Sequence, residues 1–428
     1  MSMSLDRTYA EALDREDPLG RFRERFYVQP GTYYMDGNSL GLLSRDAEQS
    51  LLATLDNWKT LGIDAWMRAN PPWFFFGEEL GKRQATLFGA EPDEIVVAGT
   101  TTINLHALVA TFYQPVGERR KIVATELDFP SDIYALQAHI RDHAGDPALD
   151  LVRVPSNDGR QVSEDDIIVA MTDDVALVVL PSVLYRSGQL LDIERLSRAA
   201  NERGIPIGFD CAHSAGVIPH RFSEWGVDFA LWCNYKYLNA GPGSVGGLYV
   251  NRRHFGKLPA LPGWWGYAKE RQFDMLHDFE GAPGAGAWQI STINVLSAAP
   301  LIGSMDIVDE AGIDAIRAKS LQLTDYLMQL LDASGLISDE YGYAIGTPRE
   351  HASRGGHVAI EHEHGTQIAR ALKARGVVPD FRPPNVIRLA PVPLYTTFAD
   401  VWETVQHLRS IIDTGEYAAL AEEREVVA

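Results

Sequence analysis

Residues 229–243 read FALWCNYKYLNAGPG, and this stretch decides the fold of the chain. A short apolar run leads to Lys236, which stands between Tyr235 and Tyr237 and is followed by a glycine-rich turn. A lysine is strongly hydrated and is rarely buried without a partner. Lys236 therefore either extends its ammonium group back to water or places its amine where chemistry requires one.

Short apolar runs alternate with helical patterns on the N-terminal side of this stretch and just beyond it. We expect strands at 93–101, 121–125, 150–154, 175–181, 205–209, 227–232 and 246–250. Helices are expected at 5–27, 45–61, 77–90, 131–143 and 192–203, with a loop at 31–44. Buried strands separated by helices are typical of a mainly parallel sheet with helices on both faces, so the sequence predicts an α/β fold.

The pattern changes after about residue 300. A long helix is expected at 305–334, strand-like stretches at 355–364 and 385–393, and further helices at 365–375 and 398–413. This order predicts a smaller α+β domain at the C-terminus. We therefore expect three parts: an N-terminal segment, 1–55, that packs with the small domain; a large α/β domain, 56–305; and the small domain, 306–428.

Composition excludes several classes of protein. The 428 residues include 38 Lys and Arg against 58 Asp and Glu, a formal charge of −20 that disfavours a nucleic-acid partner. Cys211 and Cys233 are too few for a disulfide framework and suggest a reducing compartment. The N-terminus has no apolar core typical of a signal peptide, and the apolar run at 175–184 is too short to span a membrane. We expect a soluble, cytoplasmic protein.

Two charged residues follow neighbouring predicted strands. Asp210 ends the apolar run 205–209, with His213 three residues further on, and Lys236 follows the next strand. Ligands of parallel sheets bind beyond the carboxyl ends of the strands. A lysine amine that binds a cofactor aldehyde, with an aspartate for the pyridine nitrogen, is what a pyridoxal phosphate site requires. A helix cap for Asp210 and a solvated Lys236 are the alternatives.

Other stretches supply the remaining parts of such a site. Gly99 and three threonines, including Thr101 and Thr102, lie between a predicted strand and helix, where backbone N–H and hydroxyl groups bind phosphate. A simple threonine cap is the alternative. Phe129 and Asp132 follow another strand, where an aromatic ring can stack on a flat cofactor or belong to the core.

Two motifs are set aside. Residues 241–246 match G-x-G-x-x-G, but a dinucleotide site needs a strand before the motif and a helix after it, and here a strand follows. The HEH at 362–364 alternates on a predicted strand without further ligands, so it indicates a solvated strand face and no metal.

Seven pieces of sequence carry a family resemblance. They are YMDGNSLG (34–41), FPSD (129–132), YRSGQLLDI (185–193), GFDCAHSAG (208–216), WCNYKYLNAGPG (232–243), PGWWGY (262–267) and DFRPPNVIRLAPVPLY (380–395). Across about residues 30–410 the chain resembles kynureninase, a pyridoxal phosphate enzyme of fold type I in the class V aminotransferase superfamily. The resemblance implies a mainly parallel seven-stranded sheet and a homodimer with shared active sites.

The resemblance also implies residue roles. Lys236 would bind the cofactor covalently, Asp210 would pair with its ring nitrogen, and Phe129 would stack on its ring. The remaining cofactor contacts would come from Thr101, Thr102, Asp132, His213, Tyr235, Trp264 and Thr292. Arg388 would pair with the substrate carboxylate through both of its forked N–H groups. Asn38, Trp66 and Tyr267 would complete the substrate site.

The implied reaction is hydrolytic cleavage of the Cβ–Cγ bond of L-kynurenine to anthranilate and L-alanine, with Lys236, Tyr235 and Asp210 as the catalytic residues. Trp66, Thr292 and Tyr267 stand where relatives have other residues, so 3-hydroxykynurenine or another aryl-ketone amino acid stays open as substrate. An aminotransferase or lyase of the same superfamily is the alternative. A cysteine desulfurase is disfavoured because it needs a cysteine beyond residue 233.

Overall fold

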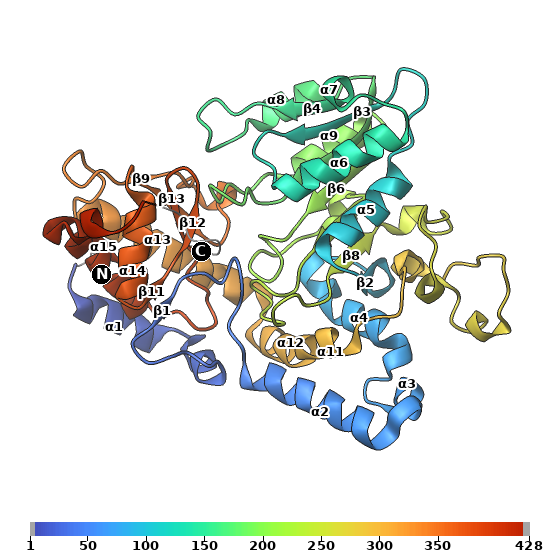
Figure 1. Ribbon diagram of the computed structural model, residues 1–428, viewed down its shortest axis with the longest axis horizontal. Helices are drawn as coiled ribbons and strands as arrows, with labels where there is room; N and C mark the ends of the chain where they lie inside the picture. Colours follow the sequence, from blue (N-terminus) through green and yellow to red (C-terminus); the bar gives the residue numbers. More distant parts are fainter. Residues whose placement is uncertain (1–4, 423–428) are drawn as a thin grey trace.

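A seven-stranded sheet forms the centre of the computed structural model, which describes residues 5–422 (Figure 1). Its spatial order is β2-β8-β7-β6-β5-β3-β4, and all neighbours run parallel except β8, which is antiparallel to β2 and β7. The strands are β2 (Ile95–Val97), β3 (Lys121–Thr125), β4 (Leu151–Val154), β5 (Val175–Pro181), β6 (Ile207–Asp210), β7 (Phe229–Trp232) and β8 (Gly247–Val250). The predicted mainly parallel α/β sheet is confirmed.

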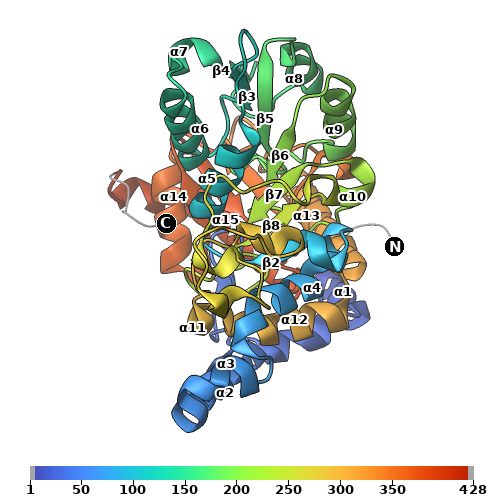
Figure 2. The ribbon, with the colours of Figure 1, turned by 90° about the vertical axis from the view of Figure 1, so that its right-hand side faces the viewer.

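Successive residues of the strands belong to different hydrophobic cores because side chains alternate between the two faces of a sheet. Val178 and Ala230 lie in one core, whereas Leu177 and Leu231 lie in the other. Helices α5, α6 and α7 cover one face, and α8, α9 and α10 cover the other (Figure 2). These helices are α5 (Thr101–Phe112), α6 (Pro130–Asp142), α7 (Pro147–Asp150), α8 (Glu164–Ala170), α9 (Ile193–Glu202) and α10 (Phe222–Trp225).

The C-terminal part is built on a four-stranded antiparallel sheet in the order β12-β13-β10-β9. Its strands are β9 (Ala344–Ile345), β10 (Val358–Glu361), β12 (Asp380–Arg382) and β13 (Val386–Leu389). Helices α13 (Ile313–Ala333), α14 (Gly365–Ala374) and α15 (Phe398–Thr414) pack with it. This arrangement confirms the predicted smaller α+β domain.

The N-terminal segment packs on this smaller sheet and its helices. Helix α1 (Arg7–Glu16) contacts α15, and the Asp14 carboxylate accepts hydrogen bonds from the first backbone N–H groups of α15, at 2.6 and 3.0 Å. Strand β1 (Tyr33–Tyr34) pairs in parallel with β11 (Val377–Val378). This pairing places the loop after β1, which contains Asn38 and Ser39, between the seven-stranded sheet and the four-stranded sheet.

The helix expected at 305–334 is in fact two helices, α12 (Pro300–Ala311) and α13. Gly312 separates them with a φ of 78°, a conformation that ends a helix and that glycine adopts without strain. The remaining helices are α2 (Arg45–Leu61), α3 (Ala65–Arg68), α4 (Phe76–Phe88) and α11 (Val295–Ala298). Between residues 5 and 422 we find no helix with the length and apolar character to cross a membrane.

Candidate active site

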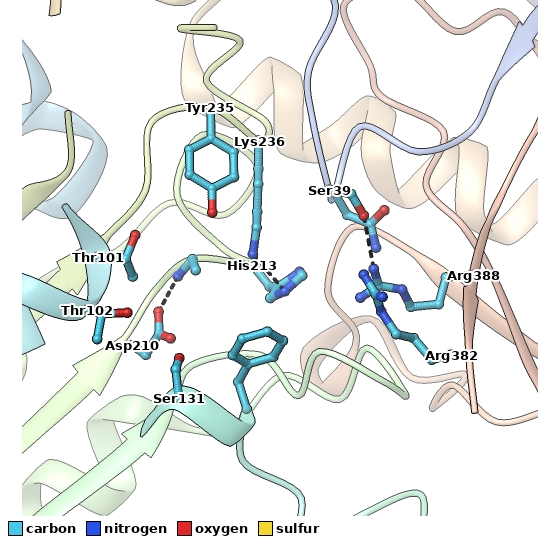
Figure 3. Close-up of a pocket in the computed structure, with 13 residues that line it drawn as sticks. Ser39, Thr101, Thr102, Ser131, Asp210, His213, Tyr235, Lys236, Arg382 and Arg388 are labelled. Atoms are coloured by element: carbon cyan, nitrogen blue, oxygen red, sulfur yellow. Dashed lines mark hydrogen bonds between the residues drawn. The ribbon is translucent and has the colours of Figure 1, made fainter. Parts of the chain in front are cut away.

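A cavity of about 230 Å³ lies between the carboxyl ends of the large-sheet strands and the small sheet (Figure 3). Most of its lining follows β2, β3, β6 and β7, and the rest comes from the loop after β1 and from β12 and β13. The lining residues are Asn38, Ser39, Thr101, Thr102, Phe129, Ser131, Asp210, Ala212, His213, Tyr235, Lys236, Arg382 and Arg388. Most of the site residues predicted from the sequence therefore meet in one place.

Lys236 points into this cavity from the loop after β7 (Figure 3). Its Nζ lies 2.9 Å from Nε2 of His213, which follows β6. Burial and the neighbouring Lys236 lower the pKa of His213 well below its usual value, so the imidazole is neutral and accepts a hydrogen bond from the amine. The amine is thus held at the strand end by a residue from the adjacent loop.

Three carboxyl groups are buried near Lys236. Asp210 ends β6 and accepts a 2.7 Å hydrogen bond from the N–H of Ala212, and burial raises its pKa although Lys236 opposes this effect. Burial and Asp210 raise the pKa of Asp132 on α6 well above its usual value. Burial also raises the pKa of Asp128 to about 7. Burial thus disfavours the charged form of these carboxyl groups, and a cationic or proton-donating ligand at this end of the cavity would stabilise it.

Thr101 and Thr102 begin the 12-residue helix α5 and line the cavity with their hydroxyl groups (Figure 3). Thr100 precedes the helix, but its side chain makes no capping hydrogen bond. The threonines are therefore not explained by capping, and the helix N-terminus presents free N–H groups that suit an anion. The Phe129 ring, 45% exposed, lines the cavity and packs against Tyr185 in a T-shaped pair, with 5.2 Å between ring centroids.

Two arginines from the small sheet occupy the opposite end. Arg388 on β13 is only 1% exposed and contacts the Asp380 carboxylate, the carbonyl of Tyr185 at 2.6 Å and the Ser39 hydroxyl at 3.1 Å. Arg382 on β12 reaches the same Asp380 at 3.1 Å. Sequence reasoning missed Ser39, Asp380 and Arg382, because no strand was expected at 380–382, where β12 places Asp380 and Arg382 on one face.

Five predicted residues lie outside the lining of this cavity. Asp132 is buried directly behind it, beside Asp210. The other four lie further away and belong to the segments around Trp66 and 264–292. Trp66 packs against Trp265 with 5.3 Å between ring centroids, and Tyr267 is buried. Trp264 is 41% exposed beside Phe273, and Thr292 lines a second cavity, of about 260 Å³. The cavity as formed by a single chain is therefore not lined by Trp66, Trp264, Tyr267 or Thr292.

Comparisons with known proteins agree with this geometry. A family model for the kynureninase C-terminal domain matches residues 316–408. A kynureninase of Geobacillus thermodenitrificans is 56% identical over 420 residues, covering 98% of this chain and 97% of that protein. A kynureninase of Bacillus anthracis is 57% identical with the same coverage. The chain belongs to the kynureninase family.

Solved structures show the fold of this kynureninase-family chain. A mutant of C-DES, with glycine covalently linked to its pyridoxal phosphate cofactor, has a TM-score of 0.76 and 18% identity, covering 91% of this chain and 99% of that one. A cysteine desulfurase from Thermococcus onnurineus NA1 gives the same TM-score and identity, with coverage of 92% and 98%. The predicted fold type I is therefore confirmed.

The cofactor of the family is pyridoxal phosphate, and the residues at the large-sheet end fit it. A lysine amine reaches the cavity, and the unused N–H groups of α5 and its threonine hydroxyls suit the phosphate. The buried carboxyl groups of Asp210 and Asp132 suit a protonated ring nitrogen, because a neighbouring cation would stabilise a carboxylate that burial otherwise disfavours. Nδ1 of His213 is buried and has no hydrogen-bond partner among residues 5–422, as expected of a group that awaits a ligand.

Proposed function

We propose that this protein is a kynureninase that hydrolyses the Cβ–Cγ bond of L-kynurenine to give anthranilate and L-alanine. The observation that carries the proposal is the Lys236 amine, held 2.9 Å from a neutral histidine, in a cavity with Asp210 at one end and Arg388 at the other. The 56% identity to kynureninases over nearly the full chain supports this reaction over the others known for the fold.

Bound pyridoxal phosphate supplies an electron sink that stabilises negative charge on the substrate carbons. Lys236 would hold the cofactor covalently and, once released by the substrate amine, would remove the proton from Cα. His213 orients the Lys236 amine through their hydrogen bond. Because the imidazole is neutral, it accepts this hydrogen bond and does not compete for the proton from Cα. Asp210, with Asp132 beside it, would keep the ring nitrogen protonated.

Tyr235 is the proposed acid for the later protonation at Cβ. Burial raises its pKa above the usual value for tyrosine, so the phenol keeps its proton at neutral pH and can donate it. Thr101 and Thr102, with the N-terminus of α5, would hold the phosphate, and Phe129 would stack on the ring. Arg388 and Asn38 would bind the substrate at the other end.

We further propose that the protein acts as a homodimer in the cytoplasm, with Trp66, Trp264, Tyr267 and Thr292 contributing to a site shared between two subunits. Their position outside the cavity of their own chain supports this arrangement. Large apolar side chains such as Trp58 (59% exposed), Ile63 (79%) and Phe273 (72%) offer surface for a partner. The two buried free thiols suit a reducing compartment.

The test is a visible spectrum of the purified protein followed by addition of L-kynurenine, with release of anthranilate followed by fluorescence. Cofactor absorbance with anthranilate release is the expected result. Absorbance without anthranilate from kynurenine, and without 3-hydroxyanthranilate from 3-hydroxykynurenine, would contradict the proposal, and transfer of the amino group to pyruvate would then identify an aminotransferase. Light scattering tests the dimer, and an active monomer would contradict it.

A further inference from the structure

Arg388 has little hydrogen-bonding capacity left for a ligand. A guanidinium carries five N–H groups, one on Nε and two on each Nη. The Nε and Nη2 of Arg388 contact Asp380, Nη2 also donates to Ser39, and Nη1 donates to the carbonyl of Tyr185. One N–H on Nη1 therefore remains. A carboxylate held through both of its oxygens needs at least one further donor, unless these internal contacts break.

Arg382 has the donors that Arg388 lacks. It lines the same cavity, its side chain is 34% exposed, and within residues 5–422 its one ion-pair contact is the 3.1 Å approach of Nη2 to Oδ1 of Asp380. Its Nε is buried without a hydrogen-bond partner among the described residues. A buried donor without a partner is costly, so a ligand oxygen that reaches this guanidinium is favoured.

The small sheet places the two arginines side by side. Asp380 on β12 stands directly opposite Arg388 on β13, and Arg382 follows Asp380 by two residues, so all three side chains project from one face. The Asp380 carboxylate contacts both guanidinium groups. Figure 3 shows these two guanidinium groups beside each other and near Ser39 at the cavity wall. Nearby, both polar atoms of the Asn38 side chain are buried and unpartnered within residues 5–422.

We propose that Arg382 is a specificity-determining residue that binds one oxygen of the substrate α-carboxylate, while the free N–H of Arg388 binds the other. Asp380 then acts as the brace that spaces the two guanidinium groups. The site would accept α-amino acids and reject amines or amides of the same shape. Two adjacent guanidinium groups favour a ligand carboxylate in addition to the Asp380 carboxylate that they already share. This inference rests on the proposed function, which supplies an α-amino acid as substrate.

A purely structural role for Arg382 would be to neutralise Asp380. Arg388 already makes two contacts with that carboxylate, so Asp380 keeps a buried cationic partner without Arg382. Arg382 is about one-third exposed and lines the cavity, whereas a role limited to pairing with Asp380 would not require it to line the cavity. The two roles differ in a measurable way, because only the ligand-binding role depends on whether the ligand carries a carboxylate.

The experiment compares wild type with Arg382→Gln in the cofactor-loaded protein. We expect the KM for L-kynurenine to rise about tenfold or more, as for loss of a charge-assisted hydrogen bond, with kcat within about threefold. Spectral titration with L-alanine should show a similar rise in Kd, whereas the Kd for L-alaninamide should stay within about twofold. Arg382→Lys, which keeps the charge but loses the planar fork, should fall between these results.

Arg160→Gln is the matched control, because Arg160 is 37% exposed and ion-paired with Glu361 at 2.7 Å but does not line the cavity. It should leave all three constants unchanged. An unchanged KM in active Arg382→Gln, or equal loss of alanine and alaninamide binding, would overturn the inference. If Arg382→Gln does not fold, the alanine-to-alaninamide ratio of Arg382→Lys decides. A wild type that binds alanine but forms no anthranilate would instead contradict the proposed function.

Discussion

The two ends of the central cavity bury charge in opposite ways. At the large-sheet end, burial raises the pKa values of Asp128, Asp132 and Asp210, and the charge of Asp210 raises those of the first two further. At the small-sheet end, the Asp380 carboxylate is paired with Arg388 and Arg382, and Arg388 is almost fully buried. The large-sheet end thus has more carboxyl groups than cationic side chains, whereas at the small-sheet end the carboxylate is paired with arginines.

This difference indicates what each end receives. An acidic cluster beside one lysine becomes more stable when a protonated ring nitrogen arrives, so the large-sheet end suits a cofactor that stays bound. Two guanidinium groups braced by one carboxylate bind an incoming anion without moving far, so the small-sheet end suits a substrate that exchanges at each turnover.

The sharpest test of the cofactor end is Lys236→Ala. We expect kcat for kynurenine to fall by at least about a thousandfold, because one substitution removes both the covalent attachment and the proposed base. Circular dichroism and the melting temperature should stay close to wild type. The control Lys121→Ala removes a lysine paired with Asp174 on the surface, and it should keep full activity. Near-normal turnover by Lys236→Ala would refute the site assignment.

Stability should separate the two ends when one carboxylate is neutralised in each. Asp380→Asn leaves two guanidinium groups without their counter-charge, one of them 1% exposed, and should lower the free energy of unfolding by about 3 kcal/mol. Burial already disfavours the charge of Asp128, so Asp128→Asn mainly loses one of the two hydrogen bonds that this side chain accepts from Thr125, and its effect should be about 1 kcal/mol. Urea denaturation of both variants measures the difference. Equal losses would mean that the contrast in charge is not real.

The pH dependence of stability should reveal Asp36, which lies near the arginines. Burial and the neighbouring Asp380 raise its pKa from 3.8 to about 6. The folded protein therefore binds an extra proton between these values, and this stabilising contribution, present below about pH 4, is lost as the pH rises through about 6. Relative to Asp36→Asn, wild type should lose about 3 kcal/mol between pH 4 and 7.

Urea midpoints of wild type and Asp36→Asn at several pH values give that difference directly. Because other groups titrate equally in both proteins, their contributions cancel in the comparison. A constant difference across pH 4 to 7 would show that Asp36 has an ordinary pKa in the folded chain.

The smallest expected effect is that of the aromatic ring at the cofactor end. Phe129→Leu keeps an apolar side chain but removes ring stacking, so the Kd for pyridoxal phosphate should rise about fivefold. Cofactor absorbance after dialysis against increasing dilutions measures it. Tyr134 on α6, the helix that Phe129 directly precedes, is a 66% exposed aromatic residue that does not line the cavity, and Tyr134→Leu should leave the Kd unchanged. A similar rise in both variants would show a general effect on α6.

Sequence reasoning located the large-sheet end well because its residues follow strands one after another. Asp210, His213 and Lys236 come directly after β6 and β7, and Thr101 and Thr102 open the helix after β2. The strand limits expected at 121–125 and 175–181 agree with β3 and β5, since continuous apolar runs mark buried parallel strands. The single helix expected at 305–334 was wrong because glycine at 312 ends one helix and begins another.

Periodicity and strand ends are local properties of the chain, so the sequence predicted the sheet and put Asp210 and Lys236 at the ends of neighbouring strands. Arg388 was expected from the family resemblance, but its contacts with Ser39 and Tyr185, and the place of Arg382 beside it, depend on segments that are far apart in sequence and meet only in the folded chain. The folded structure also shows that most N–H groups of Arg388 contact Asp380, Ser39 and the carbonyl of Tyr185. Hydrogen-bond capacity depends on what surrounds a side chain in space, and no linear pattern records those neighbours.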